Sequence, residues 1–168
     1  YLEAGADIIN TNTFGANGLK FHPGGEFELE PVIKAAVANA KEAVRQAGKE
    51  AFIALDMGPT GKLLKPLGDL DFEAAVGLYR DIAGIGVKEG VDLALIETMS
   101  DSYEAKAAVL AAKENSSLPV FATMIFDSKG KLLTGGNVAS TVALLEGLGV
   151  DALGINCGLG PVQMKEIL

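Results

Sequence analysis

Short apolar segments alternate along this chain with longer segments of helical periodicity, and this alternation limits the fold more than any other feature. Five short segments are almost continuously apolar, as expected for strands buried on both faces: residues 6–10, 51–56, 91–97, 119–124 and 150–156. The spacing of apolar residues between them predicts four helices: residues 26–47, 71–90, from 101 onward, and 137–149. No β-hairpin signal interrupts the series, so we expect an α/β fold with parallel strands and helices outside them.

Local signals mark the ends of the predicted helices. Gly48 is a suitable C-terminal stop for the first helix. Asp71 is a suitable N-cap for the second helix, and the fourth helix follows Asn137. At the third helix, Asp101 and Glu104 have the spacing of a capping box, with Asp in place of the usual Ser or Thr.

Two architectures satisfy this order of elements, namely an open doubly wound sheet and a (β/α)8 barrel. A doubly wound nucleotide binder should carry a glycine fingerprint after its first strand. Residues 10–15, Asn-Thr-Asn-Thr-Phe-Gly, lack that fingerprint, which favours the barrel. A full barrel has roughly 250 residues, so five strands predict an incomplete (β/α)8 TIM barrel.

The ends of the chain suggest one partial domain over residues 1–168, truncated at both ends. The chain starts at Tyr1 without an initiator Met and stops within a predicted helix near residues 164–168. An incomplete barrel has two unpaired sheet edges, which could support self-association.

The composition excludes several classes of partner. A net charge of −8 without a basic run argues against nucleic acid. No apolar stretch approaches the roughly 18 to 20 residues of a membrane span. Cys157 is the single cysteine, so no internal disulfide can form, and we expect a reducing, cytoplasmic location.

Candidate site residues stand where the predicted strands end, because barrel enzymes place catalysis at the C-terminal ends of their strands. The polar residues at these positions are Asn10 to Thr13, Asp56, Glu97, Thr98, Thr123, Asn156 and Cys157. Each of them could instead be an ordinary turn former. Glu97 stands out because a carboxylate that closes an apolar run is costly to bury without a partner such as a ligand amine. Cys157 alone could equally be a small buried hydrophobe, since no second Cys or His stands at ligand spacing.

Four motifs together resemble the homocysteine S-methyltransferase family, in the family's order: residues 5–14, 58–61, 92–98 and 154–157. The resemblance implies that Glu97 anchors the amino group of homocysteine and that Asn12, Thr13 and Asn156 help to form the substrate site. It also implies that Cys157 is one of three cysteine ligands of a catalytic zinc. The other two would be an adjacent pair that lies beyond this chain. No residue is assigned as a catalytic acid or base.

Finer features are similar to the homocysteine-binding domain of the cobalamin-dependent methionine synthases: residues 14–17, 66–68 and 126–135. This similarity implies methylcobalamin as the methyl donor, with cobalamin and folate held by other modules. Zinc would deprotonate the homocysteine thiol, whose free pKa is about 8.5, and hold the sulfur for attack on the methyl group. With one zinc ligand of three, the isolated chain is predicted to bind zinc weakly and to be inactive.

Two alternatives remain open from the sequence. A different barrel enzyme such as an aldolase would need a Schiff-base lysine near a strand end, and the predicted strand segments contain none. A non-catalytic remnant that serves as a binding or assembly module would be favoured if the complete protein lacks the downstream cysteine pair.

Overall fold

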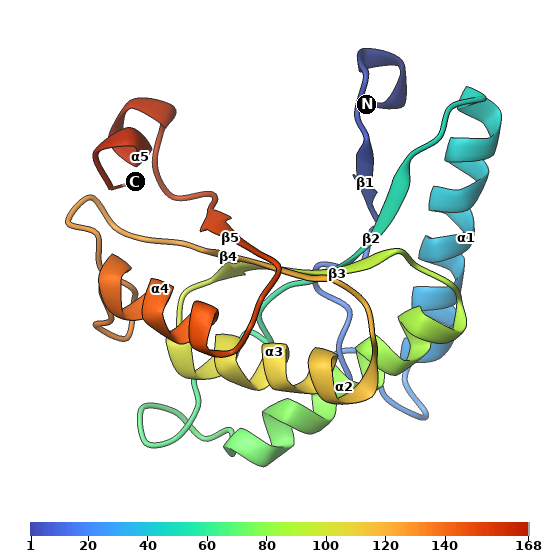
Figure 1. Ribbon diagram of the computed structural model, residues 1–168. Coiled ribbons are helices and arrows are strands. Elements are labelled where there is room, and N and C mark those ends of the chain that lie inside the picture. Colours follow the sequence, from blue (N-terminus) through green and yellow to red (C-terminus); the bar gives the residue numbers. More distant parts are fainter. Residues whose placement is uncertain (168) are drawn as a thin grey trace.

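The structure is a computed structural model that describes residues 1–167, and it confirms the predicted α/β architecture. Its elements are η1 (Leu2–Ala4), β1 (Ile8–Asn10), α1 (Leu29–Ala47), β2 (Phe52–Met57), α2 (Phe72–Lys88), β3 (Leu93–Met99), α3 (Ser102–Asn115), β4 (Val120–Met124), α4 (Val138–Gly147), β5 (Ala152–Ile155) and α5 (Pro161–Ile167). All strands are parallel and lie in the order β1-β2-β3-β4-β5, each beside its neighbour in sequence. Figure 1 shows α1 to α4 along one side of this curved sheet. The sheet is not closed, as expected for an incomplete barrel.

The element boundaries differ from the prediction mainly at the edges. Helix α1 begins at Leu29, three residues later than predicted, because Glu28 is extended (φ −98°, ψ 154°) and serves as the N-cap. Strands β1 and β5 are shorter than predicted because each has a hydrogen-bonded neighbour on one side alone in the described sheet. The predicted helix near the end of the chain is α5, and Leu168 lies outside the described residues.

The two faces of the sheet differ in burial. Leu55 and its register partner Ala94 face the helices and are completely buried. Gly86 of α2 packs so closely on β2 that a Cβ atom there would lie 2.4 Å from Leu55 Cδ2. On the opposite face, the register partners Ile8 and Phe52 are exposed, Phe52 by 59%. This uncovered face corresponds to the interior of a barrel, whose parallel strands are normally closed into a ring.

Of the two residues in the capping box predicted for α3, Asp101 caps the helix and Glu104 does not. Asp101 does act as N-cap, accepting a 2.9 Å hydrogen bond from the Tyr103 backbone N–H. The Glu104 side chain is instead buried, and its Oε1 accepts hydrogen bonds from Thr60 and Tyr79. Tertiary partners that are far away in sequence therefore replaced the local bond that the spacing suggested. Within residues 1–167, no helix is long and apolar enough to cross a membrane.

Candidate functional site

The carboxyl ends of β3, β4 and β5 meet around the side-chain amide of Asn156. Its Oδ1 accepts hydrogen bonds from the Thr98 backbone N–H at 3.1 Å and from Thr123 Oγ1 at 3.0 Å. Its Nδ2 donates to Thr98 Oγ1 at 2.7 Å and to Glu97 Oε2 at 3.2 Å. Asn156 therefore connects three strand ends and orients the carboxylate of Glu97, which is half-buried at the end of β3.

Cys157 lies beside this amide with an exposed thiol. Its Sγ is 3.6 Å from Asn156 Nδ2 and 3.7 Å from Thr98 Oγ1. Thr98 and Cys157 have φ values of 60° and 58°, and they are the two non-glycine residues with positive φ in the part of the chain that the structure describes. Such a conformation is unusual for a β-branched residue, and strained residues of this kind cluster at functional sites. The exposure of Cys157 also contradicts the alternative of a buried hydrophobe.

A metal site is not complete within these residues. A catalytic zinc takes about three protein ligands and keeps one position open. Across residues 1–167, no group of three His, Cys, Asp or Glu side chains could hold a metal ion. Cys157 supplies one exposed sulfur donor, so this part of the chain fits a single ligand of such a site.

Asp56, at the carboxyl end of β2, is a site residue that the sequence analysis did not single out. It is 6% exposed, and its backbone is held on both sides by the loop after β1. Its N–H donates to Thr11 Oγ1 at 3.1 Å, and its carbonyl accepts from Thr13 Oγ1 at 2.7 Å. Burial, together with the charge and hydrogen bonding of Glu97, raises the pKa of Asp56 to about 7. The available signal was a carboxylate that closes an apolar run, the argument already applied to Glu97.

The loop after β2 is fixed by close packing and by the buried carboxylate of Glu104. A Cβ atom on Gly58 would lie 2.5 Å from the Phe14 carbonyl oxygen, so the loops after β1 and β2 approach each other too closely for a larger residue. Glu104 Oε1 accepts hydrogen bonds from Thr60 N–H at 2.7 Å and from Tyr79 OH at 3.0 Å. Burial and Glu104 together raise the pKa of Tyr79 well above its usual value, so the phenol remains a donor.

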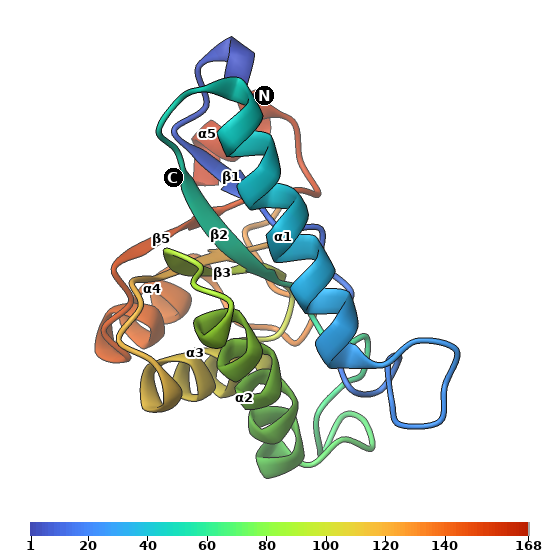
Figure 2. The ribbon, with the colours of Figure 1, turned by 90° about the vertical axis from the view of Figure 1, so that its right-hand side faces the viewer.

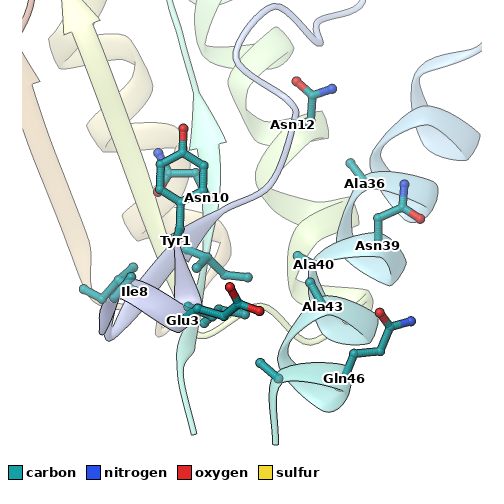
Figure 3. A pocket seen from close by; sticks show the side chains of 14 residues that line it. Tyr1, Glu3, Ile8, Asn10, Asn12, Ala36, Asn39, Ala40, Ala43 and Gln46 are labelled. Atoms are coloured by element: carbon teal, nitrogen blue, oxygen red, sulfur yellow. The ribbon is translucent and has the colours of Figure 1, made fainter. Parts of the chain in front are cut away.

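The two remaining predicted site residues lie on the loop after β1. Thr13 is buried, and its hydroxyl is occupied by Thr11 and by the Asp56 backbone. Asn12 is exposed and lines a groove between β1 and α1, as Figure 3 shows. Seen from the side, α1 runs beside the β1 edge of the sheet (Figure 2). Neither Glu97 nor Cys157 lines this groove, so it is separate from the cluster of Glu97, Asn156 and Cys157.

Comparison with known proteins identifies the family. The family model described as homocysteine S-methyltransferase matches residues 1–168. This chain belongs to the homocysteine S-methyltransferase family. The resemblance inferred from the four sequence motifs is thereby confirmed.

Individual relatives agree with this assignment. Methionine synthases from Mycobacterium leprae (strain TN) and Mycobacterium tuberculosis (strain ATCC 25618 / H37Rv) are 31% and 32% identical over the whole of this chain, which covers 15% of each. The metallated form of the homocysteine methyltransferase MmuM from Escherichia coli is 26% identical, with a TM-score of 0.77. That match covers 98% of this chain and 62% of MmuM. The apo form of MmuM has a TM-score of 0.68 at 24% identity.

Proposed function

We propose that this chain forms the homocysteine-binding part of a zinc-dependent methyltransferase that converts homocysteine to methionine. The observation that carries the proposal is the arrangement of Glu97, Asn156 and Cys157 at one end of the sheet. Asn156 Nδ2 lies 3.2 Å from the Glu97 carboxylate and 3.6 Å from the Cys157 sulfur. The Asn156 amide therefore lies between the Glu97 carboxylate, which can bind an amino group, and the Cys157 thiol, which can bind a metal. Both groups suit homocysteine methylation in a member of the homocysteine S-methyltransferase family.

Glu97 would bind the α-ammonium group of homocysteine. Hydrogen bonds between ionised partners are shorter and stronger than neutral ones, and an ammonium group offers three donors. Asn156 Nδ2 donates one hydrogen bond to Oε2 of the Glu97 carboxylate, and a carboxylate has further acceptor positions that a ligand can use. Asn12 and Thr13, on the loop after β1, are proposed to contribute to the wall of the substrate site on the strength of the sequence motif.

Cys157 would be one ligand of the zinc ion, with the other ligands supplied from outside residues 1–167. The existence of a metallated form of the related enzyme MmuM supports a metal in the family. The exposed sulfur and its two polar neighbours, Asn156 Nδ2 and Thr98 Oγ1, suit a thiolate that binds a metal at the rim of the barrel. Methylcobalamin is proposed as the donor on the strength of the sequence similarity at residues 14–17, 66–68 and 126–135. A single exposed thiol suits a reducing compartment such as the cytoplasm.

The test is calorimetric titration of this chain with L-homocysteine under reducing conditions. The variant Glu97→Gln should bind at least about tenfold more weakly, because the charge-assisted hydrogen bond is lost. Glu114→Gln, at an exposed position of α3, is the matched control and should bind like the wild type. Mercaptobutanoate, which lacks the amino group, should not distinguish Glu97→Gln from the wild type. Equal homocysteine affinity in Glu97→Gln and the wild type would refute the role of Glu97.

A further inference from the structure

Asp56 carries an unsatisfied polar atom in the interior. Among the buried side chains of residues 1–167, its Oδ1 is the atom that has no hydrogen-bond partner. The residue is more than nine-tenths buried, with 6% of its surface exposed. An unpaired buried carboxylate oxygen is costly, so a site that retains one calls for a partner from elsewhere.

The neighbours of Asp56 define what that partner must be. Glu97, on the adjacent strand, is close enough for its charge and hydrogen bonding to act on the Asp56 carboxyl. Thr11 and Thr13 bond the Asp56 backbone and bring no charge. Asn156 brings one amide N–H to Glu97 and no charge either. The surroundings of Asp56 and Glu97 therefore have excess negative charge and a vacant acceptor, Asp56 Oδ1, which suit a cation with several N–H donors.

We propose that Asp56 is a second substrate-binding carboxylate, which together with Glu97 holds the α-ammonium group of the amino-acid substrate, and that ammonium binding expels the proton of the Asp56 carboxyl. The inference rests on the proposed function, because it takes the homocysteine amino group as the ligand. It adds to that function a second acidic residue and a proton stoichiometry.

The charges balance in this exchange. Burial and the nearby Glu97 carboxylate raise the pKa of Asp56 to about 7, so below that pH the Asp56 carboxyl keeps its proton and the free site has a net charge of −1. The ligand ammonium brings a charge of +1 and three N–H donors. In the bound state both carboxylates are ionised and one proton has passed to water, so the total charge is unchanged. No covalent bond other than O–H is broken.

The pH dependence follows from this balance. Because binding releases a proton, affinity should rise with pH until the free pair has lost its proton, near the pKa of about 7 for Asp56. The other polar groups around Glu97 and Asn156 are the uncharged Thr98 and Thr123, together with the Cys157 thiol beside Asn156. A ligand without a thiol therefore separates the carboxyl proton from any thiol proton of homocysteine.

The experiment titrates this chain with L-methionine by calorimetry in phosphate and in Tris, whose ionisation enthalpies differ. We expect about one proton released per methionine bound near pH 6 and much less near pH 8.5. Methylthiobutanoate, which is methionine without its amino group, should release none. Asp56→Asn should abolish the release and weaken binding about tenfold near pH 8.5. Asp81→Asn, at an exposed site on α2, should match the wild type.

Each outcome has one meaning. Methionine binding with the same heat in both buffers, or with unchanged affinity in Asp56→Asn, would refute the role of Asp56. If Glu97→Gln still weakens binding in that case, the proposed function stands with Glu97 as the single acidic anchor. No binding of either methionine or homocysteine to the wild type would contradict both proposals.

Discussion

Replacement of Asp56 by Asn should stabilise this chain, and the gain should grow with pH. The folded state raises the pKa of Asp56 from 3.8 to about 7, chiefly through burial and then through Glu97. A raised carboxyl pKa means that ionisation opposes folding, so the penalty is absent below about pH 4 and complete above about pH 7. Roughly three pKa units at 1.36 kcal/mol each correspond to about 4 kcal/mol, an upper limit for the pair. Asn has nearly the same shape and cannot ionise.

Thermal unfolding of the wild type and Asp56→Asn across this pH range would measure the effect. Near pH 4 the two melting temperatures should agree closely, and near pH 8 the variant should melt higher by roughly 5 to 10 °C, for a gain of about 2 to 4 kcal/mol. Asp81→Asn, whose side chain is 63% exposed, should follow the wild type at every pH. Parallel curves for Asp56→Asn and the wild type, without a gap that widens with pH, would refute the reasoning.

Two further predictions concern the buried Glu104 cluster and the metal. Tyr79→Phe removes the phenol that donates to Glu104 and to the Gly58 carbonyl, and it should lower the free energy of unfolding by about 1 to 2 kcal/mol in urea denaturation. Tyr103→Phe, with Tyr103 43% exposed, should change it by less than about 0.5 kcal/mol, and equal effects would contradict the assigned role. Metal analysis should find substoichiometric zinc and no homocysteine methylation in this chain, because Cys157 is one ligand of about three. A protein that carries the whole barrel should hold about one zinc, lost in Cys157→Ala, and full retention in that variant would exclude Cys157 as a ligand.

The order of strands and helices could be predicted because the central strands β2, β3 and β4 are buried on the helix side and the apolar residues of α1 and α2 recur at helical spacing. Within the segment predicted as the third strand, residues 93–96 are continuously apolar and are bounded by Asp92 and Glu97, and such runs are typical of parallel strands. The ends of β1 and β5 were less predictable, since single hydrogen bonds to the neighbouring strand continue past them: the Asp7 carbonyl accepts from Phe52 N–H, and Asp151 N–H donates to the Val120 carbonyl. Pairing, rather than composition, decides where an edge strand ends.

Those residues of the candidate site could be predicted whose own position in the sequence indicates a function. Glu97 could be found because a carboxylate at the end of an apolar run needs a partner. The role of Asn156 in joining three strand ends depends on residues up to 59 positions away, which no local pattern contains. The same holds for Glu104. It stands three residues after Asp101, which is the capping-box spacing, and that spacing cannot show whether its side chain bonds the helix end or a distant residue. The Glu104 contact with Thr60, 44 residues away, was decided by packing.

The stability cost of Asp56 and its proposed contribution to binding have one physical origin. An apolar residue at this position would avoid the penalty, yet the sequence has a carboxyl group there, beside a second carboxylate and without a donor of its own. An ammonium ligand supplies the missing charge and donors, so it would reverse the same repulsion that opposes ionisation in the free site. The two effects must therefore occur together. If Asp56→Asn showed no pH-dependent gain in stability, the Asp56 carboxyl of the free site would hold no proton near neutral pH, and substrate binding could expel none.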